Sequence, residues 1–433
     1  MRDILVVAIV ALGCVAALRR PWIGVLLWTW LSIMNPHRYT WSWAYDAPLA
    51  AYAAGATLIG LLLTRERESP FKSLAVVLLV LFTAWATLSW LLGFDPSGDY
   101  ERWNRMFKIN FMIIVALSLL HSKLHVLALA WVVTASLAIL GVKGGIFTLA
   151  SGGSFRVWGP PGSFVEDNNA MALALVLTIP LLRFLQLQLH SRWGRWGMGA
   201  AMVLCGASVL GSQSRGALLA VCAMGLLLWW RGRSRFIGGI LLVAVAIGLV
   251  MFMPETWSER MATISTYEQD SSAMGRIDAW WVSWNVALNY PLGGGFNLAR
   301  DWLFALYAPV PNAIPRAPHS IYFEVLGNHG FVGLGLFLLM WLVTWRVATH
   351  VRREAAAHAQ ARWCGDLASM CQASLLGYAV GGAFLNLSYF DLPYNIMVLI
   401  VLARVWIRNK GWERETAHTW ESRLVPGMSP SRA

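Results

Sequence analysis

The chain has 433 residues, of which 58% are hydrophobic and only 13% are charged. An average soluble domain carries roughly a quarter charged residues, so this composition excludes an ordinary soluble enzyme and predicts a protein embedded in lipid. The net charge of +12 comes from short basic clusters between apolar stretches, as the positive-inside rule requires, and not from a surface for nucleic acid. The five cysteines have no CxxC spacing, which gives no support to a zinc site or a disulfide framework.

Apolar stretches recur along the whole chain with no soluble domain of ordinary size between them. The candidate spans lie near 4–18, 22–34, 47–64, 73–93, 109–120, 124–141, 169–182, 197–211, 216–230, 236–253, 329–345, 370–388 and 395–407. Several are too short to cross a hydrocarbon core of about 30 Å alone, and the first two could form one shallow hairpin. The sequence therefore predicts an all-α polytopic membrane protein, a single membrane domain over 1–433 with about 12 transmembrane helices.

Basic clusters give this bundle an orientation. The clusters around Arg65, Arg192, Arg231, Arg346 and Arg404 alternate along the chain as cytoplasmic ends should. The opposite face then collects the segments 94–108, 142–168, 211–215 and 254–316. We expect 254–316 to be a large periplasmic loop and 412–433 to be a polar cytoplasmic tail.

The long loop contains a helical pattern. Its apolar residues at helical spacing are Ile277, Trp280, Trp281, Trp284 and Leu288. This pattern predicts an amphipathic helix near 275–289 that lies along the outer membrane surface. Ser271 and Ser272 are candidate caps, and the Pro291 to Gly295 turn is expected to end the helix.

Two arginines on the predicted outer face stand where a helix begins. Arg215 follows the polar turn Gly211–Ser214, so its guanidinium and the free backbone amides point at one volume, an arrangement suited to an anion. Arg276 is placed at the beginning of the amphipathic helix, where the helix dipole adds to its charge. For both residues, a contact with lipid headgroups is the alternative.

His319 lies in Pro315-Arg316-Ala317-Pro318-His319-Ser320, just before an apolar helix. Histidine can accept a proton near neutral pH, which makes His319 the candidate general base. We expect Arg215 and Arg276 to lower the pKa of His319 and keep it neutral. A structural role at the helix start is the alternative, and His329 is expected in a turn that connects two helices.

The segment from Arg156 to Asn169 is the other polar insertion, and it ends where a new span begins. Asn168 or Asn169 is expected to cap that helix. Glu166 and Asp167 are candidate base or metal ligands, although adjacent side chains point apart on a helix. The chain has no DxD, HExxH, P-loop or GxSxG motif, so metal, nucleotide and serine-hydrolase chemistry have no support.

Together these motifs resemble those of the O-antigen ligase superfamily, which includes O-antigen ligases, O-antigen polymerases and protein O-oligosaccharyltransferases. The resemblance covers most of the chain and is strongest from about 140 to 345. It rests on Phe164 to Asn169, on Ser214-Arg215-Gly216, on Gly275-Arg276 with Trp280 or Trp281 and Pro291 to Gly295, and on His319 with Glu324, Gly327 and Gly330. The chain departs from the pattern at Ser320, where many relatives have Asn, and at Asp167-Asn168, where an Asn-Pro pair is common.

The resemblance implies a glycosyltransferase C-like enzyme of the bacterial inner membrane, with its active site on the periplasmic side. It implies transfer of O-antigen from undecaprenyl pyrophosphate to a hydroxyl of lipid A-core, with inversion and without a metal or other cofactor. Arg215 and Arg276 would bind the pyrophosphate, because this leaving group needs compensation of its negative charge and not a general acid. His319 would take the acceptor proton. The candidates for further donor or acceptor contacts are Arg156, Glu166, Asn168, Asn169 and Arg316.

Three alternatives stay open. An O-antigen polymerase or a protein O-oligosaccharyltransferase would use the same carrier with another acceptor, and the motifs barely separate them from a ligase. A transporter of lipid-linked glycans would also be helical and basic. Transporters, however, usually place ionisable groups within their spans and often show two similar halves, whereas the charges here gather at one face and no repeat is evident.

Overall fold

The computed structural model describes residues 1–232, a few positions between 239 and 257, and residues 271–415. All regular elements of this part of the chain are helices. They are α1 (Arg2–Arg19), α2 (Pro21–Met34), α3 (Leu49–Leu63), α4 (Leu74–Leu91), α5 (Tyr100–Leu119), α6 (Lys123–Ala150), α7 (Asn168–Gln188), α8 (Arg192–Gly211), α9 (Arg215–Arg231), α12 (Ser271–Asn289), α13 (Asp301–Tyr307), α14 (Ile321–Ala356), α15 (Arg362–Gly381), α16 (Asp391–Arg408) and α17 (Gly411–Arg414), with short 3₁₀ turns at Pro36–Tyr39, Ala359–Ala361 and Gly382–Phe384. Most of the predicted span 236–253, part of the predicted loop at 258–270 and the tail from 416 lie outside the described residues.

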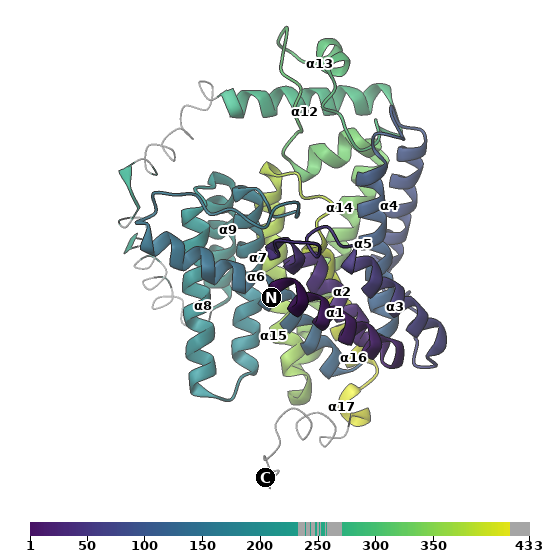
Figure 1. Ribbon diagram of the computed structural model, residues 1–433, viewed down its shortest axis with the longest axis vertical. Coiled ribbons are helices and arrows are strands. Elements are labelled where there is room, and N and C mark those ends of the chain that lie inside the picture. Colours follow the sequence, from purple (N-terminus) through teal and green to yellow (C-terminus); the bar gives the residue numbers. More distant parts are fainter. Residues whose placement is uncertain are drawn as a thin grey trace.

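The long helices form one bundle, and α12 crosses one end of it (Figure 1). In this view α8 and α9 lie on one side, α3, α4 and α5 on the other, and α14, α15 and α16 between them. The segment that joins α12 to α14, including the short α13, lies at the same end of the bundle as α12. This end therefore holds the described part of the predicted outer loop from α12 onward.

The pattern of burial fits a bundle surrounded by lipid. Phe184 of α7 and Tyr394 of α16 are completely buried, and nearly every residue of α16 is buried. Outer helices, in contrast, expose large apolar side chains such as Leu12 and Leu62. In water so much exposed apolar surface would favour association, but in a bilayer it faces hydrocarbon.

Five of the described helices are long and apolar enough to cross a membrane: α4, α6, α7, α14 and the helical stretch Ala359–Phe384 that contains α15. The apolar helices α2 and α3 are shorter. This result supports a multi-pass membrane protein, while the count of about 12 crossings stays a prediction. Several spans were expected to be too short to cross alone, and α2 and α3 are of this kind.

Two predicted boundaries differ from the structure. The span near 124–141 was expected to end before Lys143, but α6 continues to Ala150. The helix persists because its glycines pack directly against α8: a Cβ on Gly145 would stand 2.1 Å from the Leu204 carbonyl oxygen. α14 begins at Ile321, shortly after His319 as expected, but it continues beyond the predicted span near 329–345 to Ala356.

The Pro291 to Gly295 turn docks on α14 at a kink. Gly330 has φ 66° within α14, and a Cβ there would lie 2.1 Å from the Pro291 carbonyl oxygen, so only glycine fits both the conformation and the contact. The amides of Gly294 and Gly295 donate to the carbonyl oxygens of Gly327 and Asn328 at 2.9 and 3.1 Å. This docking fixes the loop that follows α12 to the core of the bundle.

Candidate active site

A cavity of about 240 Å³ lies where α7, α9 and α12 begin. Three arginines from distant parts of the chain line it: Arg156, Arg215 and Arg276. Asn168, Asn169 and Asp167 line it as well, so six of the residues singled out in the sequence meet in one place. Asp167 is the acidic residue among the lining side chains. Three guanidinium groups against one carboxylate make the cavity suited to an anion.

Arg215 is the first residue of α9, as its sequence context predicts. Ser214 caps this helix, accepting a hydrogen bond from the Ala217 amide at 3.3 Å. Gln213 adopts φ 57°, which turns the chain sharply between α8 and α9, and its side chain accepts a hydrogen bond from Arg156 Nε at 3.3 Å. The turn thereby places Arg156 beside the beginning of α9, where the helix dipole favours negative charge.

The cap of α7 is Asp167, and the prediction of an Asn168 or Asn169 cap is wrong. The Asp167 carboxylate accepts hydrogen bonds from the amides of Asn169 and Ala170, at 2.8 and 3.3 Å. Asn168 is instead the first helical residue, and its buried amide donates to the Ser212 carbonyl oxygen at 2.7 Å. It therefore joins α7 to the α8–α9 turn that carries Arg215.

Arg276 lies one turn further into its helix than the sequence suggested. Because α12 begins at Ser271, Arg276 is in the second turn, and the helix dipole falls off within the first. Its importance lies in its position between two cavities. Besides the arginine cavity it lines a neighbouring cavity of about 270 Å³, together with Arg316 and His319.

His319 lines this second cavity in a backbone conformation that is uncommon for residues other than glycine. Its φ is 45°, in the left-handed region. Trp280 of α12 holds the chain on both sides: its indole N–H donates to the Pro318 carbonyl oxygen at 2.7 Å, and its ring stacks on Phe323 at 4.9 Å. The Trp280 side chain, predicted to face the membrane surface, therefore positions the histidine instead.

The surroundings of His319 favour its neutral form. Burial lowers the pKa of His319, the Arg276 guanidinium lowers it further, Arg316 acts in the same direction, and Asp167 opposes them. The sequence had assigned this effect to Arg215 and Arg276. Arg316 takes the place of Arg215, because it lies in the same segment as the histidine and lines the same cavity. A neutral imidazole is the form that can accept a proton.

Glu166 lies apart from both cavities. Its carboxylate accepts a hydrogen bond from the Gly162 amide at 2.9 Å and so closes the exposed loop before α7. Neither cavity has Glu166 in its lining. Of the candidate site residues, Arg276 lines both cavities, and Glu166 lines neither. The others divide between the first cavity (Arg156, Asn168, Asn169, Arg215) and the second (Arg316, His319).

Sequence reasoning missed a larger polar cavity of about 410 Å³ on the other side of the histidine segment. Ala317 and Pro318 line it, whereas Arg316 and His319 line the arginine side, so this short segment is a partition between the two. Its other lining residues include Arg102, Arg105, Phe164, Phe296, Asn297, Glu324, Asn328, Asn386 and Tyr389. Arg102 and Arg105 could have pointed to this cavity in the sequence, because they lie one turn apart on the outer face, where the positive-inside rule predicts few arginines.

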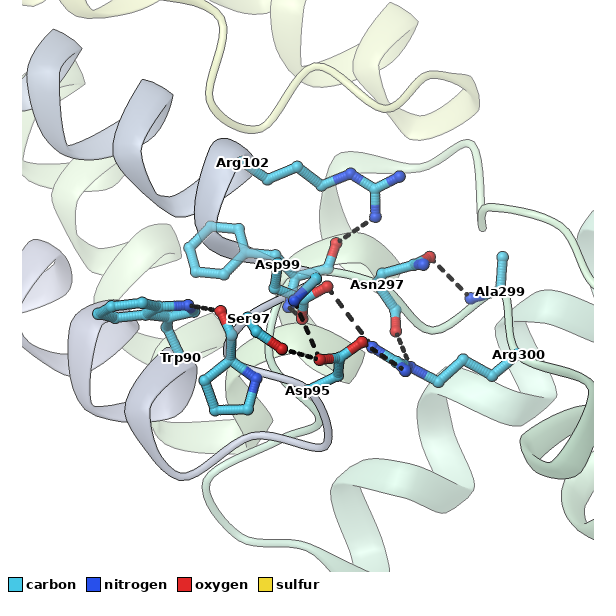
Figure 2. Close-up of polar contacts among 11 residues, drawn as sticks. Trp90, Asp95, Ser97, Asp99, Arg102, Asn297, Ala299 and Arg300 are labelled. Atoms are coloured by element: carbon cyan, nitrogen blue, oxygen red, sulfur yellow. Dashed lines mark hydrogen bonds and ion pairs between the residues drawn. The ribbon is translucent and has the colours of Figure 1, made fainter.

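A network of polar contacts builds the wall of this larger cavity (Figure 2). The Asp99 carboxylate accepts a hydrogen bond from the Phe296 amide at 2.7 Å and lies 3.5 Å from Arg300. Arg102 donates to the Phe296 carbonyl oxygen at 3.1 Å. Asp99 at the end of the α4–α5 loop and Arg102 in the first turn of α5 therefore hold Phe296 in place. The Phe296 ring packs on His329 and Tyr389 at 4.9 and 5.2 Å.

Deeper in the same wall, polar groups of α14 and the α15–α16 connection meet. Glu324 accepts hydrogen bonds from the Ser388 hydroxyl at 2.6 Å and the Ser388 amide at 3.2 Å. His329 lies in the α14 kink, between helical pieces as predicted, and its ring forms a hydrogen bond with the Tyr389 hydroxyl at 2.8 Å. The hydrogen bonds of Glu324 and of the Tyr389 hydroxyl rigidify this wall and so help to fix the shape of the cavity.

These features define a multi-pass helical membrane protein with a cationic cavity and a histidine at one end of its bundle. Residues 200–338 match the family described as O-Antigen ligase. This match supports the O-antigen ligase superfamily that the motifs of the chain indicated, in the general class of ligases and polymerases. Residues 1–190 match a family of unknown function, and no curated protein matches the chain.

Proposed function

We propose that this protein is an O-antigen ligase that transfers O-antigen from undecaprenyl pyrophosphate to a hydroxyl of lipid A-core. The observation that carries the proposal is the sharing of Arg276 between two cavities, one lined by Arg156 and Arg215 and the other by His319. The residues that we assign to the leaving pyrophosphate and to the acceptor proton are therefore neighbours. The basic clusters at the opposite ends of the spans support an inner-membrane protein with these cavities on the periplasmic side.

The reaction is a direct displacement. The acceptor oxygen attacks C1 of the donor sugar, the C1–O bond to phosphate breaks, and its electron pair leaves on undecaprenyl pyrophosphate. Arg215 and Arg276 stabilise the charge that grows on this leaving group, which needs no proton. A ring nitrogen of neutral His319 takes the proton of the attacking hydroxyl. One displacement inverts the configuration at C1.

We assign the acceptor sugars to the larger polar cavity. Amides, carboxylates, arginines and the Phe164 and Phe296 rings line it, and these are groups that hydrogen-bond hydroxyls and pack on sugar faces. The segment that carries His319 separates this cavity from Arg215 and Arg276, so donor and acceptor approach the histidine from opposite sides. Such an arrangement holds the two reactants in place for attack, which lowers the entropic part of the barrier.

The test is transfer by the purified protein with carrier-linked glycan and three acceptors: lipid A-core, a second carrier-linked glycan and a protein. Transfer to lipid A-core supports the ligase. Transfer only to the second carrier-linked glycan would instead indicate a polymerase, and transfer only to the protein would indicate a protein-glycosylating enzyme. If the protein moves the donor across the membrane of vesicles but transfers no glycan, it is a transporter and not a ligase.

Variants then test the roles of the arginines and the histidine. Arg215→Ala and Arg276→Ala should each slow transfer about 100- to 1000-fold, and lysine should rescue poorly because the bidentate fork is lost. His319→Gln should be as inactive as His319→Ala while still binding the donor. A His319→Gln variant that works at the wild-type rate from pH 6 to 9 would remove the base assignment.

A further inference from the structure

A long apolar groove lies between α6 and α8, away from the cavities described above. It has a volume of about 730 Å³, and its lining residues include Leu182 and Leu185 of α7 and Leu189, which follows that helix. On α6 the lining residues recur every three or four positions from Trp131 to Ile146, so they share one side of the helix. At about 1.5 Å per residue this stretch is roughly 22 Å long, which is most of a hydrocarbon core of about 30 Å.

The groove exists because α6 and α8 are in tight contact over only part of their length. Near the arginine cavity, a Cβ on Gly145 would stand 2.1 Å from the Leu204 carbonyl oxygen, and one on Gly141 would stand 2.5 Å from Cys205 Sγ. Small residues allow this close approach of two helices in a membrane. Toward the beginning of α8 the packing opens: a Cβ on Gly197, which lines the groove, would meet nothing within 4 Å.

Shared lining residues connect the groove to the arginine cavity. Lys143 lines the groove and also a neighbouring cavity of about 270 Å³. Arg156 and Trp158 line that neighbouring cavity and the arginine cavity as well. From the groove to the arginine cavity, the lining therefore changes from apolar side chains to cationic ones, first Lys143 and Arg156 and then Arg215. A molecule with one long hydrocarbon tail and a pyrophosphate head has the same order of properties.

We propose that the groove between α6 and α8 binds the polyprenyl tail of the lipid-linked donor, and that Lys143 and Arg156 lead its pyrophosphate to Arg215 and Arg276. This inference rests on the proposed function, and it names the groove as the surface that recognises the lipid carrier of the donor. The tail lies against α6, α7 and α8, in contact with lipid along its length, and remains there when the glycan has left. Selection by the tail is thus separate from the chemistry at His319.

Filling the groove tests the proposal. Gly197→Phe places a ring in open space inside the groove, and Gly206→Phe is the matched control, because Gly206 is on the same helix, also has nothing within 4 Å of its Cβ, and is not part of the lining. Each variant is assayed with the undecaprenyl pyrophosphate-linked glycan and with the same glycan on a short isoprenoid of two units. Gly197→Phe should raise the KM for the long donor at least tenfold and leave the short donor unchanged, and Gly206→Phe should change neither.

If Gly197→Phe leaves the KM for the long donor unchanged, the groove does not bind the polyprenyl tail. An equal rise in KM for the long and the short donor would lead to the same conclusion. A photoreactive undecaprenyl pyrophosphate gives a second readout that needs no transfer. It should label peptides of α6 and α8, and excess undecaprenyl pyrophosphate, but not excess phospholipid, should suppress the labelling. Labelling of other helices alone contradicts the proposal. If the protein is labelled as expected but transfers no glycan to any acceptor, the groove binds the polyprenyl tail and the proposed function is wrong.

Discussion

Gly275 and Arg316 are in direct contact: a Cβ on Gly275 would stand 2.5 Å from Arg316 Cζ. The guanidinium of Arg316 therefore occupies the space that any larger residue at position 275 would need. This contact joins the second turn of α12, which carries Arg276, to the segment that ends at His319. The glycine of the Gly275-Arg276 pair thus has a physical role beside the site.

We expect Gly275→Ala to displace the Arg316 side chain and slow transfer roughly tenfold, the effect of about 1.4 kcal/mol lost from one charge-assisted contact. Thermal stability should not fall, because alanine is the better helix former by about 1 kcal/mol. Gly335→Ala in α14, where a Cβ meets nothing within 4 Å, is the control. Equal turnover in Gly275→Ala and wild type would show that the contact does not matter for the reaction.

The pH dependence of kcat/KM should report His319. Because burial and then Arg276 lower its pKa, the histidine stays neutral below its ordinary value of about 6.5. Activity that needs the neutral base is lost as the pH falls through this lowered pKa, so the acid limb should lie below pH 6.5. A limb at or above 6.5 would contradict the assignment.

Two neighbours of His319 should move this limb in opposite directions. Arg316→Ala removes a cation that disfavours the protonated ring, so the limb should shift to higher pH. Asp167→Asn removes an anion that favours protonation, so the limb should shift to lower pH, while the asparagine can still cap α7. Identical profiles for both variants would mean that another group limits the rate.

The wall in Figure 2 should depend on Asp99 for stability. Asp99→Ala leaves the Phe296 amide without its acceptor and removes the carboxylate beside Arg300, so we expect the free energy of unfolding to fall by about 2 to 4 kcal/mol. Asp95, which is more exposed and also lies 3.4 Å from Arg300, is the comparison, and Asp95→Ala should have a much smaller effect. Thermal unfolding in detergent measures both, and similar losses would argue against a special role of Asp99.

The acceptor assignment predicts a selective effect at Arg105, which lines the larger cavity with its guanidinium 5.1 Å from the Phe164 ring. Arg105→Ala should raise the KM for lipid A-core about tenfold, as expected for the loss of about 1.4 kcal/mol of binding. The affinity for the donor should not change. Lys108→Ala, one turn further along α5 and outside the cavity, is the control. A weaker donor affinity in Arg105→Ala would place the donor in this cavity.

Labelling with a membrane-impermeant maleimide should show which end of the bundle faces the periplasm. In a chain whose five cysteines are replaced, Val310→Cys lies in the exposed segment before α14, and Trp193→Cys lies at the exposed beginning of α8. Val310→Cys should react in cells with a permeable outer membrane, and Trp193→Cys only after the inner membrane is opened. The reverse result would invert the proposed topology.

The sequence by itself determined the helices and their order. In lipid a backbone must satisfy its hydrogen bonds within each segment, so apolar stretches give helices with little dependence on their neighbours, and α2, α3 and α4 lie close to their predicted limits. Helix starts carry local signals too, which is why Arg215 stands at the beginning of α9 as expected. The family motifs likewise needed no structure, because they are short and local.

Only the tertiary structure decided which of these residues meet. Arg156 reaches Gln213, the larger cavity joins α5 to α14, and Arg316 instead of Arg215 lies near His319, although nothing in the local sequence encodes such distances. The cap of α7 and the role of Trp280 were mistaken for the same reason: Asn168 and Trp280 bond to groups far away in the chain. Helix packing sets these contacts, and packing depends on side chains that are dozens of residues apart.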